Sequence, residues 1–430
     1  MSKPFRVGIA GLGTVGTGVV KILTQNADII TARAGRPVEI AAVSARSKGQ
    51  DRGVDLSPYD WVDNAADLAK HDGLDAVIEL IGSSEGIAAD LVNNALENKV
   101  HVITANKALV AHHGYALAQK AEENNVSLAY EAAVAGGIPI IKAMREGLSA
   151  NRFKSVYGIL NGTCNYILTM MRETGRDFAD VLDEAQKLGY AEADPTFDVE
   201  GIDAAHKLCI LTSIAFGVKP DFDAMQIQGI GNLTITDINF ATEFGYRIKL
   251  LGIARDIDGK IMQTLEPCLV PINSPLGAIE DVYNAVYAEG DFVETPLLTG
   301  KGAGEGPTAS SVVADVIDLA RGLKVPTFGT AVKDLKDADW VDLGETSSRY
   351  YIRLRVIDQA GVIADIASIL KDKNISIESM AQHGRDPGQP VSIVLTTHEV
   401  RHNAVQDAIS QIEALDTCTK KPCLMRIEEL

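Results

Sequence analysis

The sequence predicts an α/β protein in three parts: a first unit built on a parallel sheet, a mixed α+β unit, and a C-terminal unit of the split βαβ type. Over residues 1–135, short apolar runs alternate with helical patterns, and this alternation implies right-handed crossovers and a parallel sheet. From 136 to 300 the pattern is mixed, with strands and longer helices. Residues 349–430 follow the order βαββαβ, which is typical of a ferredoxin-like sandwich.

Each element of the first unit is justified by a short apolar run followed by a helical period. The first run ends in a glycine-rich turn, and the helix after it has apolar residues at Val19, Val20 and Leu23. The five strand candidates lie at residues 7–10, 38–43, 76–81, 100–103 and 127–130.

In the second unit, the clearest element is a helix at 178–188, whose apolar residues recur on one face and which ends at Gly189. The stretch 331–348 is polar and acidic and shows no clear period. We therefore predict that it is a linker.

The elements of the last unit follow from alternation and helical spacing. Ile352, Leu354 and Val356 alternate along a strand and share one side of it. The predicted order is a strand at 351–357, a helix at 361–370, strands at 375–380 and 391–397, a helix at 405–412 and a final strand near residue 424.

Composition excludes several classes of partner. The formal net charge of −18 repels phosphate, so no general affinity for nucleic acid or an anionic membrane is expected. No segment has the ~18 uninterrupted apolar residues that a membrane helix needs. The five cysteines form no CxxC pair, and the N-terminus runs directly into a strand pattern without a signal peptide. We expect a cytoplasmic protein with reduced thiols.

The glycine-rich turn after the first strand is the first motif with chemical meaning. Gly11, Gly13 and Gly16 form GxGxxG between a strand and a helix, the context that favours a dinucleotide over an ordinary turn. The three glycines permit a tight turn, close approach of a diphosphate and close helix packing. The diphosphate would bind the free N–H groups of the helix N-terminus. The first unit is thus predicted to be a Rossmann-type nucleotide domain.

The end of the second strand indicates which dinucleotide binds. An NAD site usually has an acid there that binds the ribose hydroxyls, and after Ser44 this sequence has none. Arg46 and Lys48 could instead bind a 2′-phosphate. This favours NADP(H) over NAD(H), unless the two cations are only solvated loop charges.

The most specific segment is residues 185–207. It contains several carboxylates, and Asp203 lies four residues before Lys207, so the two share a helical face and can pair. An apolar run follows Lys207, and a lysine at such an edge, positioned by a carboxylate, can act as a proton donor. Glu192 and Asp198 would suit a substrate with an ammonium group. Alone, the segment could equally be a solvated acidic loop with an ordinary ion pair.

This segment resembles the signature of homoserine dehydrogenases residue for residue. Further family motifs occur in family order: GLGTVG at 11–16, TANK at 104–107, EAAVAGGIPI at 131–140 and NGTCN at 161–165. The likeness spans almost the whole chain. It implies reduction of L-aspartate 4-semialdehyde to L-homoserine with a nicotinamide cofactor, in threonine, methionine and isoleucine biosynthesis.

The resemblance also implies residue roles. Lys207 would protonate the developing alkoxide and Asp203 would orient it, while Lys107 would lie at the cofactor–substrate junction and could share or take the proton-donor role. The predicted substrate contacts are Glu192, Asp198, Tyr190, Gly162 and Thr163.

The predicted cofactor contacts extend beyond the glycines. Residues 300–306 form a second glycine cluster, which lacks the Ser or Thr of a P-loop. In the family this segment, within a return at about 300–330, approaches the nicotinamide; a flexible hinge loop is the alternative, and the two are compatible. The full predicted set is Gly11, Leu12, Gly13, Thr14, Val15, Gly16, Arg46, Lys48, Ser83, Thr104, Lys107, Gly304 and Glu305.

Resemblance further implies a monovalent-cation site. The Glu131 carboxylate and the carbonyls of Val134, Gly136 and Ile138 would bind Na⁺, as hard oxygen ligands can. The ion would hold the junction between units. Without the resemblance, a plain Gly-Gly hinge would be the simpler interpretation.

The last unit resembles an ACT domain, a module that commonly binds amino acids. Asp358 and Gly361 lie where the family's ligand loop lies, and Gly361 permits close backbone approach. The implied effector is threonine, acting by reciprocal coupling; a purely dimerising domain is the alternative. By resemblance, the chain would be a homodimer or homotetramer.

Two rival functions remain open at this point. Another semialdehyde or amino-acid dehydrogenase should lack the set formed by Glu192, Asp198, Asp203 and Lys207, and a non-catalytic NADP- or amino-acid-sensing regulator would not need it. A further pattern is excluded: His398 to His402 matches HExxH, but it straddles a strand–helix junction, whereas zinc proteases need one helix.

Overall fold

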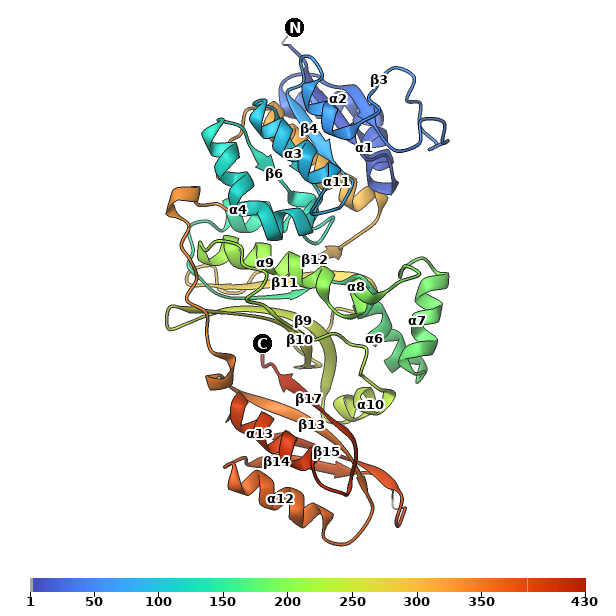
Figure 1. Ribbon diagram of the computed structural model, residues 1–430, viewed down its shortest axis with the longest axis vertical. Helices are drawn as coiled ribbons and strands as arrows, with labels where there is room; N and C mark the ends of the chain where they lie inside the picture. The colour runs from blue at the N-terminus through green and yellow to red at the C-terminus, as the bar shows by residue number, and fades with distance from the viewer. Residues whose placement is uncertain (1–2, 385) are drawn as a thin grey trace.

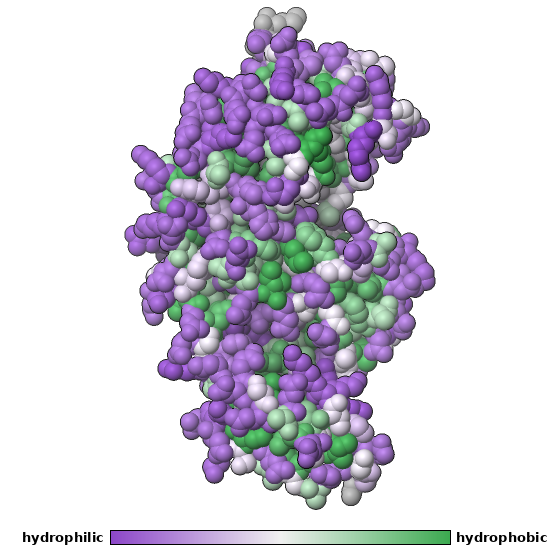
Figure 2. Space-filling model, viewed as in Figure 1, coloured by the Kyte–Doolittle hydropathy of each residue, from purple (hydrophilic) through white to green (hydrophobic). Residues whose placement is uncertain are grey.

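The computed structural model describes residues 3–384 and 386–430. Its three units are arranged one after another along the long axis, with the N-terminal unit at one end, the C-terminal unit at the other and a large sheet between them (Figure 1). Polar side chains dominate the visible face, and apolar side chains reach it in scattered patches over all three units (Figure 2). Within the described residues, no helix is long and apolar enough to cross a membrane.

The first unit contains a parallel sheet with strand order β3-β2-β1-β4-β5-β6, as the alternation of strands and helices predicts. The short strand β3 was not predicted from the sequence. The strands are β1 (Phe5–Ala10), β2 (Val38–Ser44), β3 (Asp60–Trp61), β4 (Ala76–Glu79), β5 (His101–Thr104) and β6 (Leu128–Ala129).

Helices cover this sheet, and one of them comes from far along the chain. Helix α11 (Glu305–Ala320) packs against α1, and the two share a core that contains Val19, Val20, Val312 and Val316. The other main helices of the unit are α1 (Thr14–Gln25), α2 (Ala27–Ala34), α3 (Ile87–Glu97) and α4 (Lys107–Glu123).

The second unit is built around one helix and a mostly antiparallel sheet. Helix α9 (Ile202–Phe216) is buried over most of its length, between the sheet and α4, as expected for a helix that is apolar on nearly all sides. The strands are β7 (Phe153–Ile159), β8 (Gln226–Ile227), β9 (Tyr246–Ile257), β10 (Lys260–Pro271), β11 (Tyr283–Gly290) and β12 (Leu297–Lys301). The other α-helices are α5 (Ile140–Lys142), α6 (Gly162–Thr174), α7 (Phe178–Lys187), α8 (Thr196–Val199) and α10 (Ile235–Glu243).

The third unit has the predicted βαββαβ order. Ile352, Leu354 and Val356 face its two helices, as their alternation predicts. The elements are β13 (Ser347–Ile357), α12 (Val362–Asp372), β14 (Ile377–Gln382), β15 (Pro390–Thr397), the unpredicted bridge strand β16 (Val400–Arg401), α13 (His402–Glu413) and β17 (Cys418–Ile427). Because α13 begins at His402, the HExxH pattern does not lie on one helix.

The βαββαβ pattern predicts a C-terminal unit with a sheet of its own, but its sheet is continuous with that of the second unit. Strand β17 pairs in parallel with β10, Cys268 opposite Arg426 and Leu269 opposite Ile427. The described strands of both units therefore form one sheet, which runs β12-β11-β7-β9-β10-β17-β13-β15-β14. The pairing joins residues far apart in the chain, so no local pattern reveals it.

The predicted linker is also corrected. Residues 331–348 do connect the two units, but they are fixed to the second one by backbone pairing. Ile261 donates to the carbonyl of Asp339 (2.8 Å) and accepts from Val341 (3.0 Å), and the indole of Trp340 donates to Asp221 (3.1 Å). The polar composition of this segment does not show that it is ordered, because backbone hydrogen bonding does not depend on side-chain polarity.

The open face of the C-terminal sheet lies against α10. Tyr351 and Arg353, which alternate with the core residues of β13, both reach Asp237: the phenol donates over 3.1 Å and the guanidinium over 2.6 Å. Asp237 is fully buried, and Arg353 is nearly so. This contact fixes the C-terminal unit to the second unit through buried charge.

Candidate active site

A buried carboxylate shared by two lysines lies at the junction of the first two units, where α4 meets α9 (Figure 1). Asp203 is in the first turn of α9. Its Oδ2 accepts from Lys207 Nζ at 2.6 Å, and its Oδ1 pairs with Lys107 Nζ at 2.9 Å. The predicted i,i+4 pair is thus present, and the first residue of α4 completes it from the nucleotide unit.

The electrostatics of this group favour the charged forms of Asp203 and Lys107. Burial would raise the pKa of Asp203, but the ammonium groups of Lys207 and Lys107 outweigh burial and hold that pKa well below its usual range. Burial alone would lower the pKa of Lys107, yet the charge of Asp203 raises it. Asp198 behaves differently: burial, then the charge of Asp203, raises its pKa.

One amide connects the carboxylates. The side chain of Asn161 donates to Asp198 Oδ1 (2.8 Å) and to Asp203 Oδ2 (2.9 Å), and its oxygen accepts from the backbone of Cys164 to cap α6. Lys207 Nζ also donates to the carbonyl of Leu160 (2.8 Å). The sequence motif included Asn161, but its bridging role was not predicted, because its partners lie about 40 residues away.

The predicted substrate residues surround this centre. The hydroxyl of Thr163 donates to the carbonyl of Tyr190 (2.6 Å), and a Cβ at Gly162 would lie 2.7 Å from the carbonyl oxygen of Val282, so that position is restricted to glycine. Glu192 is exposed, and its charge helps to raise the pKa of Lys107.

Two histidines near the site were not predicted. His112 of α4 and His206 of α9 approach through their Nε2 atoms at 3.0 Å, and His206 stacks on Phe222. Burial, and then the charge of His112, lowers the pKa of His206 to about 4. The low pKa keeps His206 neutral near pH 7, and the two rings form a contact between the two units beside Lys207.

The glycine-rich turn has the geometry that a dinucleotide requires. Gly11 has a φ of +94°, and a Cβ there would lie 2.5 Å from the Leu80 carbonyl oxygen. A Cβ at Gly16 would lie 2.0 Å from the carbonyl oxygen of Gly11, whereas one at Gly13 would meet open space. Among the described residues, no side chain caps the N-terminus of α1. Its N–H groups beside Thr14 and Val15 are thus free for a diphosphate.

The structure places the cationic residues after β2 at the surface. Arg46 and Lys48 are exposed, and Lys48 Nζ lies 5.8 Å from the centre of the Trp61 ring. Arg52, which was not predicted, donates from Nε to the carbonyl of Leu12 (3.2 Å) and from Nη2 to that of Ser47 (2.6 Å). Arg52 thus joins the glycine-rich turn to the segment after β2.

The ends of β4 and β5 are tied together by a buried network. Glu79 accepts from the hydroxyl of Thr104 (2.6 Å) and from the backbone of Ile81 (2.6 Å). The side-chain oxygen of Asn106 accepts a hydrogen bond from the backbone N–H of Leu109 and so caps α4. The side-chain amide of Asn106 donates to the carbonyl of Ser83 (2.6 Å). Ser83 and Thr104 thus lie at the edge of the sheet where a nucleotide is expected, next to Lys107.

The second glycine cluster returns to this edge. Gly304 (φ +116°) precedes α11, and Glu305 pairs with Lys21 of α1 (2.6 Å). A Cβ at Gly136 would lie 2.3 Å from the carbonyl oxygen of Gly302, so the two glycine-rich segments are in close backbone contact.

The predicted cation ligands occupy a buried, acid-rich position beside that contact. Glu131 accepts backbone N–H groups from Ile141 (2.9 Å) and Lys142 (2.8 Å), and its own N–H donates to Asp315 (2.9 Å). The carbonyl of Gly136 accepts from Ser311 (2.7 Å). Burial, and then the charge of Asp315, raises the pKa of Glu131 to about 7. Lys142 pairs with Asp315 (3.1 Å) beside it, whereas Glu131 itself has no ion pair within residues 3–384 and 386–430.

This raised pKa predicts a pH dependence of stability. The folded state keeps the Glu131 proton up to about pH 7, whereas the unfolded state loses it near 4.5. Between these values the folded state binds more protons, so the free energy of unfolding should fall as pH rises and level off above pH 7. Thermal unfolding in sodium-free buffer from pH 5 to 8 measures this slope, which Glu131→Gln should reduce; an unchanged slope in the variant would contradict the assignment.

The predicted effector turn is ordered in the C-terminal unit. Asp358 Oδ2 accepts from the backbone of Asp386 (2.8 Å), and Gly361 (φ +99°) precedes α12 without a side-chain cap. The turn between β13 and α12 thus places Gly361 directly before the N-terminus of α12.

A glycine-rich parallel-sheet domain, joined to a buried lysine–carboxylate–lysine group, defines a nicotinamide-dependent oxidoreductase. Comparison with family models identifies which one: residues 11–131 match the homoserine dehydrogenase NAD-binding domain, 139–317 match homoserine dehydrogenase and 350–417 match the ACT domain. The chain belongs to the homoserine dehydrogenase family.

Individual relatives agree along the whole chain. It is 46% identical to a homoserine dehydrogenase from Pseudomonas aeruginosa, over 100% of both chains, and 44% identical to one from Neisseria gonorrhoeae, over 100% of this chain and 99% of the other. The solved homoserine dehydrogenase from Thiobacillus denitrificans is 44% identical with a TM-score of 0.93, and each chain is covered to 99%. A hyperthermophilic archaeal homoserine dehydrogenase mutant solved with NADPH is 27% identical, with a TM-score of 0.65 over 76% of this chain and 99% of that one.

Proposed function

We propose that this homoserine dehydrogenase uses Lys207 to protonate the alkoxide that forms when the aldehyde of L-aspartate 4-semialdehyde is reduced. The observation that carries the proposal is the Asp203 carboxylate, which orients Lys207 at 2.6 Å and Lys107 at 2.9 Å. When bound, the nicotinamide cofactor supplies the hydride. Lys107, whose side chain is 32% exposed against 11% for Lys207, would bind substrate at the open side of the site and could share the proton transfer.

The substrate ammonium group would bind among the acidic residues. Glu192 is exposed beside the site, and Asp198 is held by Asn161. Tyr190, Gly162 and Thr163 would close the pocket around the chain of the substrate. An acidic lining favours an amino-acid substrate over a simple aldehyde, because only the former has a cationic group.

The experiment that tests this function is absorbance at the nicotinamide band while the purified protein oxidises L-homoserine. Turnover should require the α-amino group, so 4-hydroxybutanoate, which keeps the hydroxyl and the carboxylate but lacks the amino group, is the matched control. Equal turnover of both alcohols would contradict the acidic subsite. No turnover with either cofactor, from protein that binds NADP(H), would contradict the assigned chemistry.

NADP(H) is the proposed cofactor, with contacts at Gly11, Leu12, Gly13, Thr14, Val15, Gly16, Ser83, Thr104, Gly304 and Glu305. No acid follows Ser44, and Arg46 and Lys48 would contact the 2′-phosphate, with Arg52 close by. Arg46→Ala should therefore raise the KM for NADP⁺ by roughly tenfold, the loss of one charge-assisted contact, and leave that for NAD⁺ unchanged. Steady-state kinetics with both cofactors measures this, and an equal change for both would contradict the assignment.

A monovalent cation, Na⁺, is proposed at Glu131 and the carbonyls of Val134, Gly136 and Ile138. The raised pKa of Glu131 supports it, because a bound cation would favour the carboxylate. Regulation by threonine is proposed at Asp358 and Gly361, in a homodimeric or homotetrameric cytoplasmic enzyme of the threonine, methionine and isoleucine pathways.

A further inference from the structure

Three cations surround one carboxylate in a narrow cleft of the second unit, outside the lysine–carboxylate–lysine group. Arg172 Nη1 donates to Glu280 Oε1 at 2.6 Å. Lys249 Nζ lies 3.5 Å from Glu280 Oε2, and Arg247 Nε lies 3.6 Å from Oε1. The cations belong to α6 and β9, and Glu280 lies in the connection between β10 and β11. A single negative charge therefore faces three positive ones.

The neighbouring groups do not balance this excess of positive charge. Within residues 3–384 and 386–430, the one further acid in an ion pair with these cations is Glu173, which contacts Arg172 Nη2 at 3.1 Å and is 53% exposed. Solvent screens such a contact. Lys249 is fixed by neutral oxygens, Asn165 Oδ1 at 3.1 Å and the carbonyl of Ile279. The cleft thus keeps a local surplus of positive charge.

Arg247 is the least satisfied of the three cations. Among the described residues, its Nη1 is buried and has no hydrogen-bond partner. Burial, and then the charge of Arg172, lowers the pKa of Arg247. Burial also lowers the pKa of Lys249 to about 8 against the charge of Glu280, and the charges of Arg172 and Arg247 act in the same direction as burial. A buried guanidinium donor without an acceptor is costly, and a bound anion would offset that cost.

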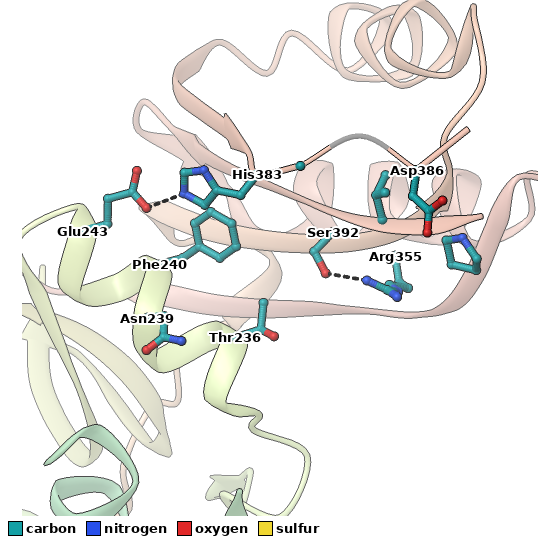
Figure 3. Close-up of a pocket in the computed structure, with 11 residues that line it drawn as sticks. Thr236, Asn239, Phe240, Glu243, Arg355, His383, Asp386 and Ser392 are labelled. Atoms are coloured by element: carbon teal, nitrogen blue, oxygen red, sulfur yellow. Dashed lines mark hydrogen bonds and ion pairs between the residues drawn. The ribbon is translucent and has the colours of Figure 1, made fainter. Parts of the chain in front are cut away.

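The cleft beside these cations has about 10 Å³ of room, enough for one water or one monatomic ion and far too little for an organic ligand. Ile238 and Thr242 of α10 line one side of it. The opposite face of α10 bears Phe240 and Glu243, and both contact His383 of the C-terminal unit (Figure 3). Helix α10 therefore separates the cleft from the C-terminal unit.

We propose that this cleft binds a monatomic anion, chloride, at Arg247 Nη1. The charges of Arg172 and Lys249 would contribute to its binding, and the ion would supply the acceptor that Arg247 lacks. Carboxylate and phosphate groups are too large for the volume. Bound there, chloride would join α6 to β9 beside α10. The inference uses no residue of the proposed active site and does not rest on the proposed function.

The test is the quadrupolar broadening of the chloride NMR line by the full chain, with sodium gluconate exchanged for sodium chloride at constant sodium. The wild type should broaden the line, bromide should reverse the broadening, and chloride should raise the thermal midpoint by about 2 to 4 °C. Arg247→Met should weaken chloride binding by about ten- to a hundredfold. Arg401→Met, at an exposed ion pair with Glu345, is the matched control and should behave as the wild type does.

Two further results distinguish an anion site from a merely structural cluster. In gluconate, Arg247→Met should be at least as stable as the wild type, because it removes a buried cation that has no full partner. Glu280→Gln should tighten chloride binding by roughly tenfold, because it removes the charge that repels the ion.

Crystals soaked in bromide locate the ion directly, and an anomalous peak is expected beside Arg247 Nη1. A water at that position without anomalous signal would overturn the proposal. Equal line broadening by the wild type and Arg247→Met, or displacement of chloride by phosphate but not by bromide, would overturn it as well.

Discussion

Replacing Lys207 by methionine is expected to lower kcat for homoserine oxidation by about two to four powers of ten, the usual contribution of a positioned proton-transfer group. Methionine keeps the length of the side chain but cannot donate to Asp203 or to the Leu160 carbonyl. The measurement is steady-state turnover with saturating NADP⁺. Binding of NADP(H), followed by fluorescence, should be unchanged, since Lys207 lies on α9 in the second unit.

Two comparisons make this result decisive. Lys107→Met should raise KM more than it lowers kcat if Lys107 mainly positions the substrate. Lys187→Met, at an exposed i,i+4 pair with Asp183, is the control for loss of a lysine and should match the wild type. A large fall in kcat for Lys107→Met with little effect of Lys207→Met would transfer the proton-donor role to Lys107.

Removing the carboxylate of Asp237 is expected to have the largest effect on stability. In Asp237→Ala the buried guanidinium of Arg353 loses its partner, and an uncompensated buried charge typically costs about 3 to 5 kcal/mol. Tyr351 loses a hydrogen-bond acceptor as well. Amide hydrogen exchange in β13, together with the thermal midpoint, should report the loss, and exchange should increase most near Arg353.

The double variant Asp237→Ala/Arg353→Met provides the test of mechanism. Removing both charges should restore much of the stability, because no unpaired ion then remains buried. Glu413→Gln, an exposed acid at the end of α13, should change little. If the double variant were as unstable as the single one, loss of the α10 cap would be responsible and not the buried charge, because Asp237 also accepts from the backbone (2.9 Å) and the hydroxyl (2.7 Å) of Thr234.

Local patterns in the sequence were sufficient for most of the fold. The alternation of Ile352, Leu354 and Val356 predicted the face of β13 that packs on the helices, and GxGxxG predicted the turn at Gly11. What local patterns could not predict is pairing between distant segments, such as β10 with β17, or the two-residue strand β3. Such short strands have no measurable period, and long-range pairing depends on the completed fold.

The same distinction applies to the active site. The i,i+4 spacing of Asp203 and Lys207 predicted their contact, because helix geometry alone sets it. The roles of Asn161, Arg52 and the His112–His206 pair arise only when separate segments meet. Asparagine, arginine and histidine have no spacing signal that indicates a bridging position.

The parallel pairing of β17 with β10 has a consequence for shortened forms of this enzyme. A chain that stops before Ser347 would leave the hydrogen-bonding groups of β10 around Cys268 and Leu269 without their neighbour. Bare strand edges attract other strands, and native proteins usually keep them covered or charged. Apart from any loss of control by amino acids, such truncated protein should therefore be prone to self-association, and a short peptide with the sequence of β17 should reduce it by covering the edge.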